Sequence, residues 1–263
     1  GAGWARCRAG GVRLALRGAE ADVLILSIFP GIDLLGMAFE LEWPEACIVR
    51  GPDLLWGGDI KRFHPPAGKF DGVIGGPPCN LWARTATFNP DKFENLIPEF
   101  ERCVAEAAPH WFLMENVPRA PSPQVESFWN FDQMVLDGAV GGATSRERRF
   151  TLGVYSKRER PTVRFEVVLN ALWPIGLERT VTSGGAQYKR DGTKYRNRKG
   201  KISCYGAKTR WSFDRGKRAQ GLSEDFDLPP FTVRAKVEAI GNGVPLAMGR
   251  AVAKAVKKVL ALA

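Results

Sequence analysis

The sequence predicts an α/β protein with a doubly wound, mostly parallel sheet, followed by a small basic region. Three observations support this fold class. Apolar runs such as 23–29 are continuous rather than alternating, which is typical of strands buried on both faces of a parallel sheet. These runs alternate with helical patterns up to about Tyr155. The stretch 157–228, rich in Gly, Lys and Arg, then breaks the alternation.

The elements are expected in the following order along the chain. A buried strand at 21–29 leads through a turn into a helix that begins at 34. Apolar periodicity predicts a second helix from Asn89-Pro90 to 108 and a last helix at 246–262. Further strands are predicted at 46–49, 54–60, 70–74, 110–114, 131–136 and 150–154. A chain of 263 residues can form one large domain with a smaller one, and we place these at 21–156 plus 236–263 and at 157–235.

Composition narrows the class of protein. The chain is 44% hydrophobic and 25% charged, as in soluble globular proteins, and no apolar run is long enough to span a bilayer. Residues 1–17 carry scattered arginines and predict no signal peptide. Five scattered cysteines without a Cys-x-x-Cys pair, together with only two histidines, argue against a disulfide framework and a zinc site. We therefore expect a cytoplasmic protein without a metal.

Positive charge is concentrated in one segment. Residues 157–218 hold 17 Lys and Arg against 5 Asp and Glu, so this segment accounts for more than the whole chain's net charge of +10. A solvated loop region or a disordered basic arm is one interpretation. A polyanion-binding face is the other, and interspersed aromatic residues favour a small folded unit. These aromatic residues are Phe165, Trp173, Tyr188, Tyr195, Tyr205 and Trp211.

Four short motifs lie at predicted strand ends, where open α/β sheets place their chemistry. Each motif is weak alone, since a lone Cys is usually an inert buried residue and an Arg-Glu-Arg run is usually a surface cluster. Their order and their placement make a stronger signal. The motifs are Phe29-Pro-Gly31, Gly76-Pro-Pro-Cys79, Glu115-Asn116-Val117 and Arg146-Glu147-Arg148.

Together with Ile240-Gly-Asn-Gly-Val-Pro245, these motifs resemble the DNA (cytosine-5) methyltransferase family. Ser27–Gly36 is similar to the family's cofactor-binding motif, and Ala219-Gln-Gly-Leu222 is similar to the element before the terminal motif. The resemblance covers roughly 23–253 in unbroken order. It implies a Rossmann-like methyltransferase fold in which 157–235 is a small target-recognition region.

The resemblance implies a reaction in which the Cys79 thiolate adds to C6 of cytosine, so that C5 becomes nucleophilic enough to accept a methyl group. Glu115 would bond N3 and the exocyclic amine. Of Arg146 and Arg148, one would grip the base O2 and the other would orient Glu115 or the loop, and Arg148 matches the O2 contact. If they lie close, the two arginines would also lower the pKa of Cys79.

The methyl donor that the resemblance implies is S-adenosylmethionine. The turn at Phe29 lacks a full Gly-x-Gly-x-x-Gly fingerprint, which argues against a dinucleotide phosphate site. Gly31 would let the backbone approach the methionine part, and Phe29 would lie against adenine. The family's ribose-binding acid has no clear equivalent, and Asp53 is the candidate. The implied cofactor-binding residues are Phe29, Gly31, Ile32, Asp53, Asp59, Ile60, Pro78, Asn242 and Val244.

The implied partner is double-stranded DNA, whose target base must be flipped out of the stack. We expect base-edge readers within 179–210, a closing loop at 80–90, a short target sequence, and a monomeric, nucleoid-associated enzyme. Two alternatives remain: cytosine-5 methylation of RNA, and a non-catalytic DNA-binding homologue. The chain departs from the family pattern at Asp33, Asn80, Leu81-Trp82 and Thr144.

Overall fold

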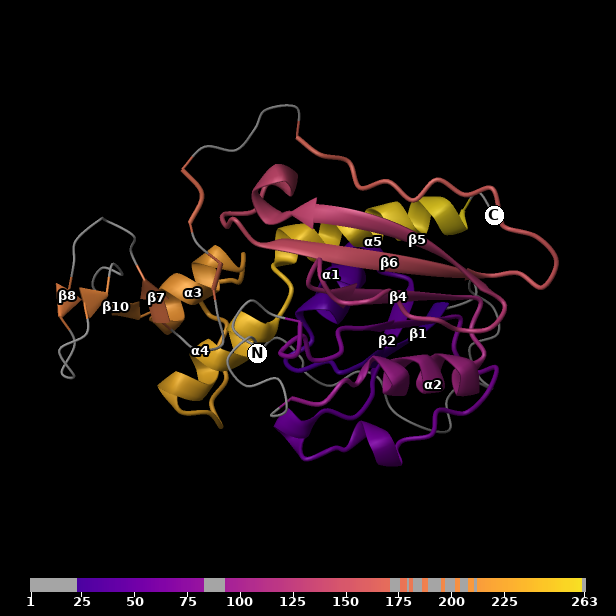
Figure 1. Cartoon of the computed structure of the whole chain (residues 1–263), viewed down its shortest axis with the longest axis horizontal. Helices are drawn as coiled ribbons and strands as arrows, with labels where there is room; N and C mark the ends of the chain where they lie inside the picture. The colour runs from indigo at the N-terminus through magenta and orange to yellow at the C-terminus, as the bar shows by residue number, and fades with distance from the viewer. Residues whose placement is uncertain are drawn as a thin grey trace.

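The computed structural model describes residues 23–82, 93–170, 176–178, 180–181, 186–188, 195–196, 202–203, 208–210 and 212–261. Its centre is a six-stranded sheet in the order β2-β1-β3-β4-β6-β5 (Figure 1). Strands β2, β1, β3 and β4 are parallel, whereas β6 runs antiparallel to both β4 and β5. The predicted α/β class with a mostly parallel sheet is confirmed.

The strands of this sheet are β1 (Val23–Ile28), β2 (Ala46–Arg50), β3 (Gly72–Gly75), β4 (Trp111–Asn116), β5 (Phe128–Leu136) and β6 (Glu147–Tyr155). The helices are α1 (Leu34–Glu42), α2 (Ile97–Ala107), α3 (Phe213–Ala219), α4 (Val233–Asn242) and α5 (Leu246–Leu260). Two short antiparallel ribbons pair β7 (Ala186–Tyr188) with β10 (Lys208–Arg210), and β8 (Tyr195–Arg196) with β9 (Ile202–Ser203).

The strand order creates a topological switch point beside β1. The chain passes from β1 to β2 on one side, and then returns to place β3 on the other side of β1. In open α/β sheets, ligands bind in the crevice outside the carboxyl ends of the strands at such a point. The turn after β1 and the Gly-Pro-Pro-Cys loop after β3 therefore flank the expected binding crevice.

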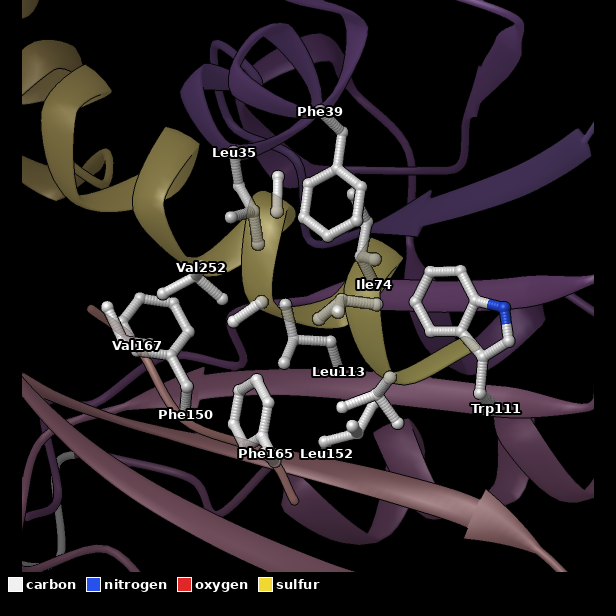
Figure 2. Packing of buried hydrophobic residues seen from close by; sticks show 14 of the residues in the cluster. Leu35, Phe39, Ile74, Trp111, Leu113, Phe150, Leu152, Phe165, Val167 and Val252 are labelled. Carbon is white, nitrogen blue, oxygen red and sulfur yellow. The ribbon is translucent and has the colours of Figure 1, made fainter. Parts of the chain in front are cut away.

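Helices cover both faces of the sheet, as a doubly wound fold requires. On one face, α1 and α5 pack over apolar side chains such as Phe39, Leu113 and Val252 (Figure 2). Phe165 and Val167, which follow β6, are buried in this same cluster. On the other face, α2 packs Phe100 and Val104 against Val73 and Phe112. The strands are apolar on both faces because both faces are covered.

A third cluster lies beyond the carboxyl edge of the sheet. It joins α3 and α4 to the starts of α1 and α5 through residues such as Ile240, Leu222 and Leu34. Val181 is buried in it as well. The segment that leads into the terminal motif is thus packed against the sheet edge that carries the predicted site. The domain boundaries given above stay a prediction.

The predicted elements differ from the structure in three main respects. The strand expected at 54–60 is wrong, because the chain there forms two 3-10 turns, Leu54–Trp56 and Ile60–Arg62. The carboxylates of Asp53 and Asp59 accept hydrogen bonds from the backbone N–H groups two residues later, at 2.8 and 3.0 Å, and such local bonds compete with strand pairing. Helix α2 begins at Ile97 rather than near Asn89, with Pro98 in its first turn.

The third difference lies at the ends of two strands. Strand β4 extends beyond Met114 to include Glu115 and Asn116, and β6 begins at Glu147. Arg148 is therefore part of a strand rather than of the turn before it. Pairing explains both extensions. Glu115 and Asn116 of β4 face Phe150 and Arg149 of β6, whereas Arg148 and Glu147 of β6 face Val135 and Leu136 of β5. Among the described helices, none is both long and apolar enough to cross a membrane.

Candidate active site

The turn after β1 is held in an unusual backbone conformation. Phe29, Gly31 and Asp33 all have positive φ, at 52°, 55° and 60°. Non-glycine residues adopt this left-handed region at a cost, and such residues gather at binding sites. Asp53 stabilises the turn, because its carboxylate accepts a hydrogen bond of 2.8 Å from the N–H of Gly31. The indole of Trp56 donates to the Gly31 carbonyl at 2.6 Å.

Asp33, which stands where the family usually has glycine, is buried at the start of α1. Its carboxylate accepts from the Ser27 hydroxyl at 2.7 Å and from the N–H of Gly36 at 3.1 Å. Arg50, the last residue of β2, forms an ion pair with it at 2.7 Å. Burial raises the pKa of Asp33, while Arg50 and Ser27 act in the opposite direction. The acid thus joins the ends of β1 and β2 at the start of α1.

The loop after β3 presents Cys79. Pro77 is buried and Pro78 is exposed, and the fixed φ of both residues limits the conformations of this segment. Asn116, at the end of β4, donates to the carbonyl of Pro77 at 3.1 Å. The N–H of Trp82 donates to the Cys79 carbonyl at 2.9 Å, which closes a turn after the thiol. Cys79 is therefore held between two strand ends.

Glu115 and Arg148 form an ion pair across neighbouring strands, with 2.7 Å between the Arg148 Nε and the Glu115 Oε1. Both side chains are largely buried. Gly76 lies against the same carboxylate, because a Cβ added there would be 2.9 Å from Glu115 Oε2. The backbone before Cys79 thus approaches Glu115 as closely as glycine allows.

The surroundings of Cys79 act on its pKa in two directions. Burial raises the pKa of this thiol, and the negative charge of Glu115 raises it further. Arg148 and Arg146 lower it, but the net shift is upward from 9.0. The sequence-based expectation named only the lowering by the arginines, and the missing contributions are desolvation and the negative charge of Glu115.

Arg146 lies behind the pair and is 4% exposed. Its guanidinium donates to the carbonyl of Gly241 at 3.0 Å and to that of Val181 at 3.2 Å, with a longer contact of 3.5 Å to the Asn242 carbonyl. Burial, and then the charge of Arg148, lower the pKa of Arg146 to about 9, which leaves it protonated at neutral pH.

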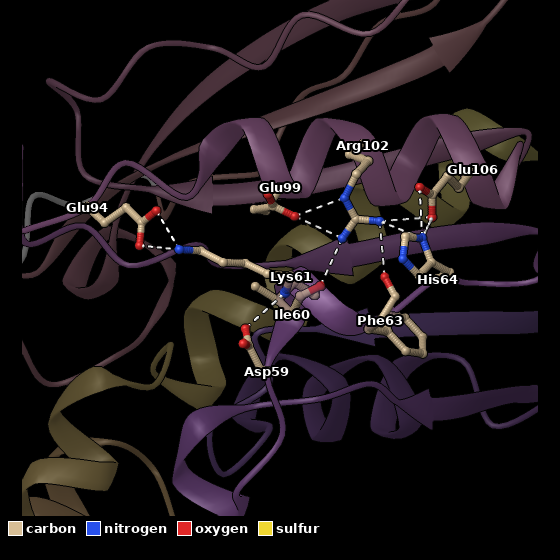
Figure 3. A network of polar contacts seen from close by, with 9 residues as sticks. All are labelled: Asp59, Ile60, Lys61, Phe63, His64, Glu94, Glu99, Arg102 and Glu106. Carbon is tan, nitrogen blue, oxygen red and sulfur yellow. Dashed lines mark hydrogen bonds and ion pairs between the residues drawn. The ribbon is translucent and has the colours of Figure 1, made fainter.

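The expected adenine-side residues lie on a separate, braced turn. Ile60 is buried, whereas Asp59 caps the 3-10 turn that follows it. Arg102 of α2 donates to the carbonyls of Ile60 and Phe63, at 2.8 and 3.0 Å, and forms ion pairs with Glu99 and Glu106 (Figure 3). Arg102 thus fixes the turn at residues 60–63 to helix α2.

A cavity that is open to solvent lies at the switch point, and residues from both halves of the site line it. Phe29, Asn242 and Val244 line it, and so does Glu115. Apolar side chains for an adenosine and polar groups for a methionine part are both present, so these residues fit S-adenosylmethionine. Gly31, Ile32, Asp53, Asp59, Ile60 and Pro78 lie outside the lining of this cavity.

The structure also identifies residues that sequence reasoning missed. Gly76, Asn116, Arg50, Trp56 and Gln220 all contact the turns that carry the predicted residues. Gly76, Asn116 and Gln220 lay within quoted motifs, which was a usable signal, whereas nothing local marked Arg50 or Trp56. The loop residues Arg84, Thr85 and Thr87, and most of the expected base-reading range 179–210, lie outside the described residues.

Comparison with known sequences supports the resemblance. Residues 57–135 match the family model for C-5 cytosine-specific DNA methylases. The type II methyltransferase M.FnuDI of Fusobacterium nucleatum is 29% identical over an alignment of 109 positions that covers 35% of this chain. That alignment spans about a third, 32%, of the length of the curated relative.

Solved structures share the fold at low identity. The Entamoeba histolytica methyltransferase EhMeth gives a TM-score of 0.59 at 12% identity, over 92% of this chain and 99% of its own. A DNA modification methyltransferase encoded within an E. coli prophage gives 0.55 at 14%, over 91% and 99%. A mutant of Spodoptera frugiperda DNMT2 gives 0.56 at 12%, over 90% and 99%. These findings confirm the resemblance of this chain to the DNA (cytosine-5) methyltransferase family, whose members use S-adenosylmethionine as methyl donor.

Proposed function

We propose that the protein methylates C5 of cytosine in a short sequence of double-stranded DNA, through a covalent bond between Cys79 and C6 of a flipped base. The observation that carries this proposal is the cavity that Glu115 shares with Phe29, Asn242 and Val244. A base held by Glu115 would thus lie against the donor cavity. The bound S-adenosylmethionine supplies an electrophilic methyl group.

The protein's own residues account for the activation of the base. Cytosine C5 is a weak nucleophile, and addition of the Cys79 thiolate at C6 transfers electron density to C5. Glu115 shares a proton with N3 and so limits the charge that develops on the ring. Arg148 holds Glu115 in place and offers donors to the base O2. After methyl transfer, loss of the C5 proton expels the thiolate and restores the aromatic ring.

The catalytic base-side residues come from three strand ends of one sheet. Cys79 follows β3, Glu115 ends β4, and Arg148 lies near the start of the antiparallel β6. Because β6 runs antiparallel to β4, its beginning lies at the same edge as the end of β4. The fold therefore supports simultaneous contact of all three side chains with one base.

The test compares two cysteines. Wild type, Cys79→Ala and Cys103→Ala are each given labelled S-adenosylmethionine with a duplex DNA library, and with transfer RNA in competition. Cys103 is the matched control, because it is buried on the inner face of α2 and burial raises its pKa to about 11. We expect labelled DNA with wild type and Cys103→Ala, and none with Cys79→Ala.

A second readout addresses the covalent step. Wild type should form a denaturation-resistant conjugate with duplex that contains 5-fluorocytosine in the target sequence, since fluorine at C5 blocks the final elimination. Bisulfite sequencing of DNA from expressing cells supplies that sequence. Methyl transfer by Cys79→Ala would falsify the proposal, and preferential labelling of RNA would redirect it to the other polymer.

A further inference from the structure

The carboxyl-terminal end of α4 is covered by two buried polar side chains from distant parts of the chain. Arg146 donates to the carbonyls of Gly241 and Asn242. Gln220 donates its amide hydrogens to the carbonyls of Ile240 and Gly243, the second at 3.3 Å. The last carbonyls of a helix have no partner within the helix, so these side chains supply what the helix lacks.

The positive charge of Arg146 suits this position at the end of a helix. Arg146 forms no ion pair with an acid among the described residues, although its side chain is buried. Its compensation comes from the carbonyl end of α4, which is the negative pole of the helix dipole. A buried guanidinium without such compensation would be strongly destabilising. Arg146 and the end of α4 therefore hold each other in place.

The capped end of α4 leads directly into the cavity at the switch point that Phe29 and Glu115 line, called the donor cavity below. Asn242, Gly243 and Val244 all line that cavity. The carbonyl of Gln220 also accepts the N–H of Leu246 at 2.9 Å, so Gln220 holds the segment from both sides. Arg146 additionally bonds the carbonyl of Val181, which lies within the basic segment 157–218. Both side chains thus contact the segment that lines the cavity, and Arg146 also contacts the basic segment.

We propose that Arg146 and Gln220 are positioning residues that shape the donor loop Asn242–Val244 by capping α4, whereas Arg148 is the arginine that serves the base. This rests on the proposed function, since it assigns Arg148 to the base. The two arginines of one motif thus have two different roles. Arg146 acts on donor affinity, and Arg148 acts on the chemical step.

The test measures binding of S-adenosylhomocysteine by calorimetry without DNA, in Arg146→Lys, Gln220→Met and Arg148→Lys. Lysine keeps the charge but loses the fork of donors. We expect dissociation constants raised roughly ten-fold in the first two variants, as for loss of hydrogen bonds to a charged or buried group. Arg148→Lys should bind with nearly unchanged affinity and lose methyl transfer instead.

Hydrogen exchange at the amides of Gly243 and Val244 gives a readout besides affinity, and it should accelerate in Arg146→Lys and Gln220→Met but not in Arg148→Lys. The double variant should lose less than the sum of the single losses, because both side chains hold one loop. Unchanged affinity and exchange in folded Arg146→Lys would overturn the inference. Because no nucleic acid is present, an error in the proposed substrate would appear in the transfer assay and not here.

Discussion

Burial opposes the very nucleophile that the proposed reaction needs. Cys79 lies between an acid that raises the pKa of its thiol and two arginines that lower it, and desolvation makes the net shift upward. In the free protein, the thiolate at neutral pH is thus scarcer than in an exposed cysteine. Glu115 contributes to this scarcity, although the proposed mechanism requires it.

The pH dependence of Cys79 alkylation tests this balance. Because the folded pKa is raised, reactivity with iodoacetamide should climb as pH rises through the alkaline range. Glu115→Gln removes the adjacent negative charge and leaves Arg148 unpaired, and both changes favour the thiolate. The midpoint for Glu115→Gln should therefore move to lower pH.

Mass spectrometry of the Cys79 peptide separates this thiol from the other cysteines. Glu147→Gln is the matched control, because Glu147 is exposed and neighbours Arg148, whereas the charges that act most on the pKa of Cys79 are those of Glu115, Arg148 and Arg146. Its profile should follow that of wild type. A midpoint for Glu115→Gln that stays in place or rises would show that the acid does not act on the thiol.

At the scale of elements, one arginine supports the turn that follows β2. Arg102 lies on α2 and bonds two carbonyls of the segment Asp59–Phe63, which carries the proposed adenine contacts (Figure 3). We expect Arg102→Met to reduce the free energy of unfolding by about 1 to 2 kcal/mol, because two charged hydrogen bonds are lost. It should also weaken donor binding.

Urea unfolding and calorimetry with S-adenosylhomocysteine measure the two effects. Arg62→Met provides the control, since that side chain is 89% exposed and has only a 3.9 Å ion pair with Asp59. A change within about 0.5 kcal/mol is expected there. Equal effects of the two substitutions would mean that the hydrogen bonds from Arg102 to this turn contribute nothing to stability or to donor binding.

The same scale shows what sequence reasoning can reach. Continuous apolar runs located β1 and β3, and the strand-end rule then placed Phe29 and Cys79 at one edge of the sheet. The strand expected at 54–60 failed because two side-chain caps overrode an apolar pattern. Helices α3 and α4 were not predicted, although Ser212 and Thr232 cap their first turns and give a readable signal.

Contacts between residues far apart in the sequence could not be predicted from the sequence. Arg146 bonds a carbonyl 95 residues further along the chain, and no local pattern encodes such a partner. The sequence identified Arg146 and Arg148 as a pair but could not assign their tasks. Likewise Asp53 was considered for the ribose, whereas its carboxylate holds Gly31 and Leu55 in the structure. The ribose contact stays a prediction.

At the scale of the whole molecule, charge is distributed in two different ways. Three of the four basic residues on α5 are matched by acids, since Arg250 and Lys254 pair with Glu42, and Lys257 pairs with Glu45. In contrast, 157–218 carries 17 basic residues against 5 acidic ones. A surplus of this size attracts a polyanion from a distance and is screened by salt.

Salt dependence of DNA binding tests whether this surplus meets phosphates. Each phosphate contact contributes about −0.9 to the slope of log affinity against log salt on duplex DNA. Replacement of Arg198, Lys199 and Lys201 by Ser should therefore make the slope shallower by up to about 2.7 and leave S-adenosylhomocysteine affinity unchanged. Replacement of Arg250, Lys254 and Lys257 by Ser removes the same charge from α5 and should leave the slope near that of wild type. Equal slopes for the two triple variants would mean that net charge alone attracts DNA, and that the basic segment is not its docking face.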